Sequence, residues 1–149
     1  MISRILVPTD GSKTAKKATK YAAELAKQTG ATIRLLSVID TSFYSVQSIP
    51  YIASVAPIIE PIEDCLTQVA ESYLKDAEKL CRENGIKSKR VIRSGHPVEE
   101  IVKEAMASKA NLIVMGSHGR SAIQAAVLGS VTFGVIHNDS KTPVLVVRR

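Results

Sequence analysis

The sequence predicts an α/β domain, a doubly wound, five-stranded parallel sheet with helices on both faces. Five short apolar runs alternate with segments of helical periodicity, which is the order that strand–helix–strand crossovers produce. Turn residues such as Gly, Pro and Asp separate the runs. The length of 149 residues corresponds to a single domain, 1–149, with an ordinary core.

The first third of the chain predicts strand, helix and strand. Residues 2–7 form an apolar run that ends at the turn Pro8-Thr9-Asp10-Gly11. Ser12 is a suitable N-cap for the helix that follows, and Gly30 is a suitable stop. Small apolar residues share one stripe of this helix, so it can pack closely on a sheet. The second strand is predicted over 31–39.

The segment 41–60 interrupts this alternation and is predicted as an apolar loop insertion before the second helix. Residues 41–59 contain no charged side chain. A solvated linker would be more polar, so the segment is expected to cover an apolar surface of its own domain, of a ligand or of a partner. The second helix is predicted from about Pro61 to Asn84, because proline suits a first turn and Gly85 suits a stop.

The remaining elements complete the alternation. A third strand over 89–94 carries charges that suit a sheet edge, and Pro97 opens a helix with acidic residues in its first turn. Residues 112–115 form the fourth strand, 129–137 a helix and 144–147 the fifth strand. Helical crossovers between these strands make the sheet parallel.

The residues after the fourth strand have the composition of an anion-binding site. Gly116-Ser117-His118-Gly119 follow that strand, and Gly129-Ser130 open the next helix. Glycine lets the backbone approach an anion, and the unpaired N–H groups of a first helical turn point toward it. Ligands of such sheets bind beyond the carboxyl ends of the strands, so residues 8–10, 38–40 and 116–119 are expected to converge on one crevice.

Composition and motifs exclude several other classes. Twenty Lys and Arg against fourteen Asp and Glu give a net charge of +6, but the cations are scattered and aromatics are only 4%, which argues against a nucleic-acid surface. The glycines match neither the P-loop nor the dinucleotide-binding pattern. Cys65 and Cys81 lack metal-site spacing and are expected to be buried thiols in a reducing compartment. The absence of a signal-peptide or membrane-span pattern predicts the cytoplasm.

Together these residues resemble a known family. Gly116, Gly119, Gly129 and Ser130 match in full the pattern Gly-x2-Gly-x9-Gly-Ser of the ATP-binding branch of the universal stress proteins. Residues 5–12 and 95–101 resemble two further stretches of that family in the same order. The resemblance covers the whole chain and is loosest over 41–59. It implies a Rossmann-like sheet of the adenine nucleotide alpha hydrolase-like class, with strand order 3-2-1-4-5.

The same resemblance implies a site for ATP or another adenine nucleotide. Asp10 would hold the ribose hydroxyls. Pro8 and Thr9 would line the base, and Val38 would contact adenine through its backbone. The phosphates would lie against the glycine loop and the following helix, a set made of Gly116, Ser117, His118, Gly119, Arg120, Gly129, Ser130, Val131 and Thr132. Mg²⁺ or Mn²⁺ would bind the phosphates and not protein side chains.

Three functions remain open at this point: a nucleotide-dependent regulatory switch acting on an unidentified protein, a weak ATPase, or a dimeric scaffold that works without nucleotide. No residue is an obvious general base, so no catalytic residue is assigned, although His118 and Arg120 are candidates near the phosphates. Asp10 has an alternative role, in which it only accepts backbone N–H groups at the first helix.

A homodimer through the fifth strand is also expected. Its four residues, Val144, Leu145, Val146 and Val147, are all apolar. In the implied strand order they lie at a sheet edge, where unpaired backbone groups favour association with the same strand of a second chain.

Overall fold

The computed structural model describes residues 1–42, 52–120, 128–138 and 141–148, with the backbone alone over 52–61. The elements are β1 (Arg4–Pro8), α1 (Lys13–Thr29), β2 (Thr32–Asp40), α2 (Ile52–Glu83), β3 (Ser88–Gly95), α3 (Pro97–Ala107), β4 (Leu112–Gly116), α4 (Ser130–His137) and β5 (Val144–Val147). The strands form a parallel sheet in the order β3-β2-β1-β4-β5, which confirms the predicted fold.

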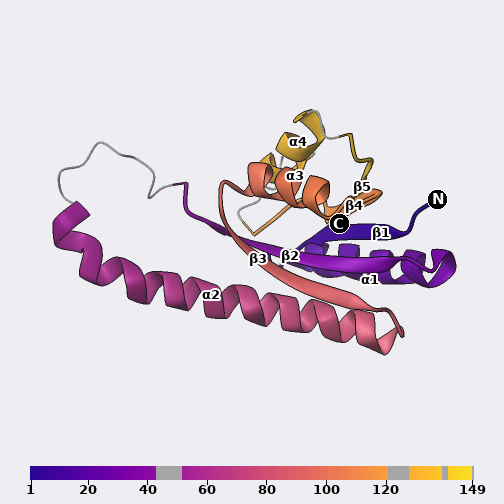
Figure 1. The fold of residues 1–149 in the computed structure, drawn as a ribbon, viewed down its shortest axis with the longest axis horizontal. Helices are drawn as coiled ribbons and strands as arrows, with labels where there is room; N and C mark the ends of the chain where they lie inside the picture. Colours follow the sequence, from indigo (N-terminus) through magenta and orange to yellow (C-terminus); the bar gives the residue numbers. More distant parts are fainter. Residues whose placement is uncertain (43–51, 121–127, 139–140, 149) are drawn as a thin grey trace.

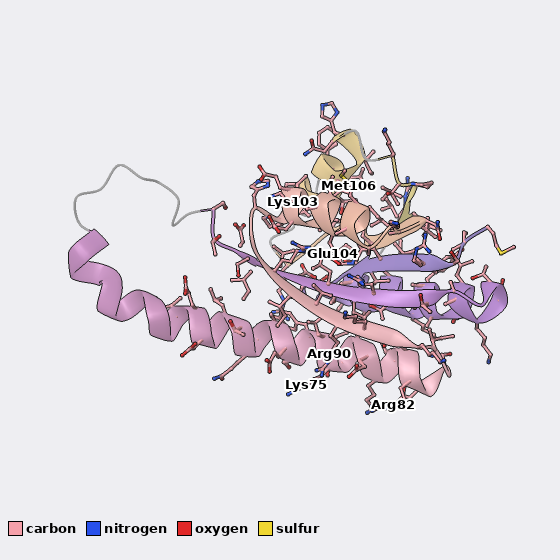
Figure 2. All side chains as sticks on the ribbon, viewed as in Figure 1. Lys75, Arg82, Arg90, Lys103, Glu104 and Met106 are labelled. Carbon is pink, nitrogen blue, oxygen red and sulfur yellow. The ribbon has the colours of Figure 1, made fainter. Side chains whose placement is uncertain are left out.

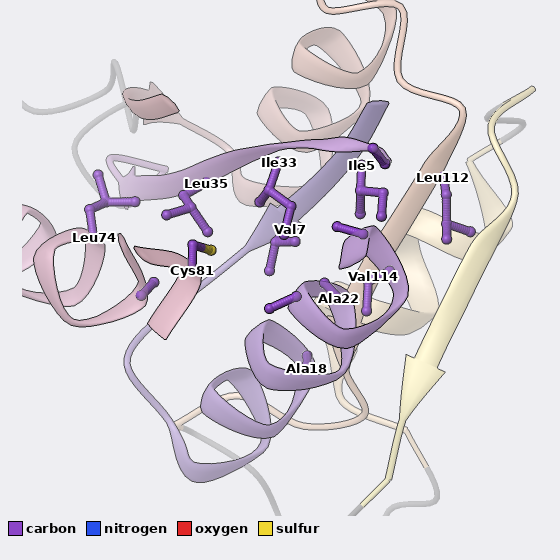
Figure 3. Close-up of a cluster of buried hydrophobic side chains, with 14 residues drawn as sticks. Ile5, Val7, Ala18, Ala22, Ile33, Leu35, Leu74, Cys81, Leu112 and Val114 are labelled. Carbon is purple, nitrogen blue, oxygen red and sulfur yellow. The ribbon is translucent and has the colours of Figure 1, made fainter. Parts of the chain in front are cut away.

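Helices cover both faces of this sheet (Figure 1). On one face, the alanine stripe of α1 packs with Leu74, Ala77 and Cys81 of α2 against the buried residues of β1, β2 and β4, as Figure 3 shows. On the other face, α3 and α4 enclose a second apolar cluster that includes Ile101 and Val135. The stripe of small side chains brings the α1 backbone close to the sheet, as the sequence predicts.

Helix α2 begins at Ile52, well before the predicted start near Pro61, so the second half of the segment expected to be a loop is helical. The helix continues through Pro57 and Pro61, although an interior proline removes an N–H donor, crowds the carbonyl four residues earlier and costs about 3 kcal/mol. Figure 1 shows that the first part of α2 extends past the sheet. Residues 43–51, the rest of the predicted insertion, lie outside the described part of the chain.

The two cysteines differ in environment. Cys81 is buried, and this burial raises the pKa of its thiol. Cys65 is exposed, so the expectation that both thiols are buried is wrong for Cys65. The sequence pattern is not sufficient here, because both cysteines lie on helix α2, and only the packing of that helix decides which thiol joins the core.

A buried carboxylate connects α3 to the neighbouring strands β2 and β3. Glu104, labelled in Figure 2, is 1% exposed and lies 2.5 Å from both Arg34 Nη1 and Arg93 Nε. Burial alone raises the pKa of the Glu104 carboxyl, but the hydrogen bonds from the two arginines outweigh it and hold that pKa below its usual value. Arg93, one of the charged residues of β3, thus forms an ion pair inside the domain.

Strand β5 lies at the sheet edge, as predicted, and each of its residues is half-buried. Leu145 and Val147 pack against the core that α1 covers, and Val144 packs against the core on the other face. These apolar side chains therefore already pack within the chain. A second chain could pair with the backbone N–H and carbonyl groups at this edge, and the homodimer stays a prediction.

Candidate functional site

The loop after β4 is held in place by hydrogen bonds between its backbone groups and residues of β5, α1 and α4. Ser117 N–H donates to the Val147 carbonyl over 2.8 Å, and Gly129 N–H donates to the Ser117 carbonyl over 2.7 Å. The Thr132 hydroxyl donates to the Gly116 carbonyl over 2.8 Å, and the Thr14 hydroxyl donates to the His118 carbonyl. These hydrogen bonds hold the end of β4 beside the start of α4, and Thr14 connects the loop to helix α1.

Asp10 joins this loop to the end of β1. Its carboxylate accepts the Ser12 N–H over 3.0 Å and the Arg120 N–H over 2.9 Å. Arg120 Nε also donates to the Asp10 carbonyl over 2.7 Å. The alternative role of Asp10, accepting N–H groups at the first helix, is therefore present in the structure. It is combined with a second role, because Asp10 also lines the cavity described below.

All three glycines of the pattern have little room for a side chain, and a Cβ on Gly116 would lie 2.8 Å from the Thr14 backbone. A Cβ on Gly119 would lie 2.7 Å from Asp10 Oδ2, which is closer than carbon and oxygen approach without bonding. A Cβ on Gly129 would lie 3.2 Å from His118 Cα and 3.3 Å from the Ser117 carbonyl oxygen. A side chain at either position would therefore press on the loop or on Asp10 before it reached a ligand.

The expected convergence at the carboxyl ends of the strands is present as two adjoining cavities. The inner cavity has a volume of about 240 Å³, and the outer one has a volume of about 670 Å³. They share part of their lining, including Asp10, Val38 and Gly119. The outer volume lies in the range of small-molecule sites, and the inner volume is slightly below that range.

Twelve of the thirteen predicted site residues line these cavities. Those that line the inner cavity are Pro8, Thr9, Asp10, Val38, Gly116, His118, Gly119, Val131 and Thr132, and the outer cavity adds Arg120, Gly129 and Ser130. Ser117 lines neither. It is buried, with its hydroxyl 2.9 Å from His118 Nδ1 and its backbone used to hold the loop.

The structure corrects the expected role of one hydroxyl, that of Thr132. The Thr132 side chain is buried, and its hydroxyl is committed to the Gly116 carbonyl, so it braces the loop and does not offer a donor to a ligand. Ser130, at the first position of α4, is exposed and lines the outer cavity. His118 is buried, in contrast to an ordinary exposed loop residue.

One wall of the outer cavity was not predicted from the sequence. It consists of α2 residues, with Leu66, Val69, Ala70 and Tyr73 facing the glycine loop. The Arg120 guanidinium carbon lies 4.6 Å from the centre of the Tyr73 ring, a cation–π contact. The helical stripe of these residues was visible in the sequence but has the same pattern as a core stripe. Asp40, at the end of β2, also lines both cavities; the sequence placed residues 38–40 at this crevice but assigned no role to Asp40.

The charges of the cavities are few. Among the described residues of the lining, the charged side chains are the carboxylates of Asp10 and Asp40 and the guanidinium of Arg120. Among the described residues, no three His, Cys, Asp or Glu side chains are grouped so that they could hold a metal ion. The arrangement therefore offers backbone donors and one cation to an anionic ligand, together with acceptors for hydroxyl groups.

Comparison with known proteins places the chain in a family. The model of the universal stress protein family matches residues 1–148. The chain belongs to this family. Universal stress protein MJ0577 of Methanocaldococcus jannaschii is 36% identical over an alignment covering 100% of this chain and 96% of the relative. Universal stress protein YxiE of Bacillus subtilis is 32% identical, with 99% and 100% covered.

Solved structures of the universal stress protein family share the fold. The structure of MJ0577 has a TM-score of 0.85 at 37% identity, covering 100% of this chain and 97% of the other. A universal stress protein solved in complex with cAMP has a TM-score of 0.67 at 27% identity, covering 99% and 97%. As for membranes, the described helices include none with the length and apolar character that crossing a bilayer requires.

Proposed function

We propose that this universal stress protein binds an adenine nucleotide, with ATP as the expected ligand, and acts as a nucleotide-dependent regulatory switch. The observation that carries the proposal is the meeting of Asp10, Val38 and the glycine loop in one continuous pair of cavities at the carboxyl ends of the strands. The family member solved with cAMP supports the class of ligand.

The two cavities suggest how the ligand lies. The inner cavity has apolar walls that include Val38, Ile101 and Met115, which suit a purine base. Asp10 stands at the junction of both cavities, where its carboxylate would accept hydrogen bonds from ribose hydroxyls. The N–H groups at the start of α4 and the Ser130 hydroxyl would then face the phosphates.

The charge of the site explains why a divalent cation is expected with ATP. Among the described residues of the lining, the single cation Arg120 faces the two carboxylates of Asp10 and Asp40, so the protein supplies no surplus positive charge for a triphosphate. Mg²⁺ or Mn²⁺ bound to phosphate oxygens would supply it, because magnesium commonly binds through substrate phosphates and few protein ligands. The metal is proposed as part of the ligand and not as a resident of the protein.

Efficient catalysis is not part of the proposal. The Nδ1 atom of His118 lies against the Ser117 hydroxyl, and Arg120 is held by Asp10 and Tyr73. Neither arrangement supplies a base for water at a γ-phosphate. A purified-protein turnover assay separates a switch from a weak ATPase. We further propose that the protein acts in the cytoplasm as a homodimer paired through β5, with an unidentified protein as its downstream partner.

The direct test of ligand class uses protein purified without added nucleotide. Mass spectrometry of the small molecules released on denaturation is expected to show an adenine nucleotide. If none is released, and added ATP, ADP, AMP and cAMP all fail to bind in calorimetry, the proposed function is wrong. A matched sample of Asp10→Ala should release much less nucleotide, since the carboxylate would be missing from the ribose end of the site.

A further inference from the structure

We propose that the amino end of the sheet carries a second binding site, which takes a compact anion with linked phosphate groups, of the size of pyrophosphate. This site lies at the opposite end of the strands from the nucleotide cavities, so it does not depend on the proposed function. Three observations carry it: the side chains that the sheet presents beyond the end of α3, the cavity that they line, and the charge of that lining.

The sheet face on the side of α3 changes character toward the amino ends of the strands. Further along, this face presents Leu6, Leu36 and Val91 to the apolar cluster that α3 and α4 enclose. Residues paired across a parallel sheet point to the same face, and the register places basic or hydroxyl side chains on this face at the amino ends: Arg4, Thr32, Arg34, Lys87 and Lys89. In Figure 1 the amino ends of β1, β2 and β3 extend beyond the last turn of α3. The side chains therefore change from apolar to mainly basic where the helix no longer covers the sheet.

These side chains line a cavity of about 270 Å³ that has no carboxylate in its described lining. The lining holds four cations, of which Arg34 is paired with the buried Glu104. Within the described part of the chain, Arg4, Lys87 and Lys89 form no ion pair. Neighbouring cations without a counter-charge repel one another, and a bound anion would remove that repulsion.

Two guanidinium groups of the cavity are held in place by the fold. Arg4 Nε donates to the Lys109 carbonyl over 2.7 Å, and Arg34 Nη1 lies 2.5 Å from Glu104 Oε1. The two Nη groups of Arg4 have no partner among the described residues, so they can donate to a ligand. A guanidinium matches the geometry of phosphate oxygens, and one that is already oriented loses less freedom when it binds them.

The charge and size of the cavity indicate the class of ligand. The charges of Arg4, Lys87 and Lys89 together exceed what one carboxylate neutralises, and the cavity is too small for an extended polymer to lie inside it. Linked phosphate groups concentrate several negative charges and many acceptor oxygens in a small volume. Pyrophosphate is the smallest anion of this kind and is therefore the probe.

Two simpler roles of these cations are distinguished from a binding site. Capping of α3 does not account for the lysines, because the carbonyls of its last turn accept the N–H groups of residues 108–110, and no described carbonyl accepts a hydrogen bond from the ammonium of Lys87 or Lys89. Lysines on an edge strand also discourage pairing with other chains. That role requires no ligand, so the experiment below decides between it and the proposed site.

Calorimetry of the full chain with pyrophosphate, in the absence of divalent cations, tests the inference. The double variant Lys87→Gln/Lys89→Gln should bind pyrophosphate at least roughly tenfold more weakly, since it loses hydrogen bonds between charged groups. The matched control Lys20→Gln/Lys27→Gln removes the same charge at two exposed positions of α1 outside the lining, and it should bind pyrophosphate normally. Both double variants should bind ATP with Mg²⁺ as the unmodified chain does.

Four results would overturn the inference. The first is that pyrophosphate fails to bind the unmodified chain, as expected if the lysines only protect the edge. The second is an equal loss in both double variants, which would show attraction by net charge alone. The third is binding that Gly129→Ala weakens and Lys87→Gln/Lys89→Gln does not, which would place the anion at the glycine loop. The fourth is citrate binding as tightly as pyrophosphate, which would exclude selectivity for phosphate groups. The ATP titration is separate, so its failure would overturn the proposed function and not this inference.

Discussion

Replacing Gly119 by alanine should weaken all adenosine ligands to the same degree, whatever their number of phosphates. The added Cβ would lie 2.7 Å from Asp10 Oδ2, so the carboxylate must move. That oxygen accepts the Arg120 N–H over 2.9 Å. The sequence pattern places Gly119 among the phosphate-binding residues, whereas the structure connects it to the residue proposed to hold the ribose. The substitution therefore tests the sugar end of the site.

The magnitude follows from the hydrogen bonds that a displaced carboxylate loses. A hydrogen bond to a charged group contributes about 1.5–3 kcal/mol. Loss of one bond to a ribose hydroxyl would weaken binding by roughly tenfold or more. The cost to folding should be smaller, about 1 kcal/mol, because Asp10 is partly exposed and water can replace a lost partner.

The assay is titration calorimetry with ATP, AMP and adenosine, and the matched control is Gly30→Ala. Gly30 has φ +72° and no atom within 4 Å of an added Cβ, so alanine there costs about 1–2 kcal/mol through the backbone without touching the site. The control should bind all three ligands normally. A Gly119→Ala protein that binds adenosine normally but ATP weakly would refute the reasoning, since it would place Gly119 at the phosphates alone.

Three further predictions concern other parts of the molecule. Gly129→Ala, which presses on the loop backbone at 3.2 Å, should weaken ATP by about tenfold and adenosine little, and calorimetry showing equal losses would contradict it. Glu104→Gln should lower the free energy of unfolding by about 2–4 kcal/mol at pH 7, measured with urea. Because the folded pKa of Glu104 is lowered, this difference should be complete above about pH 4.3 and should shrink as the pH falls further; a difference that persists undiminished at acid pH would count against the ion pairs. Val146→Pro removes an edge donor and should give monomer or insoluble protein, whereas light scattering that finds a monomer for the unmodified chain would rule out the β5 dimer.

The parts of the site that the sequence predicted depend on local order along the chain. Asp10 follows a buried strand, and the glycines at 116 and 119 follow another, so both groups reach the same edge of a parallel sheet once the alternation of elements is recognised. Which loop hydroxyls remain available could not be predicted. The direction of the Thr132 side chain depends on where the Gly116 carbonyl lies, and this is a tertiary feature.

The unpredicted wall of the site has a different cause. Pro61 resembles a helix start, and this placed the beginning of α2 too late. A helix that begins at Ile52 extends past the sheet, and residues such as Leu66 and Val69 then line a cavity and not the core. The periodicity of the sequence is the same whether such residues line a cavity or pack in the core. The length of the helix relative to the strands decides which of the two they do.

Titration of the unmodified chain and of Asp10→Ala with ATP in the presence of Mg²⁺ tests the central claim most directly. The account predicts saturable binding of one ATP per chain, weakened at least tenfold in Asp10→Ala, with AMP and adenosine weakened alike. Absence of saturable binding to the unmodified protein would contradict the proposed function. Unchanged affinity in Asp10→Ala would contradict the placement of the ligand at the carboxyl end of β1.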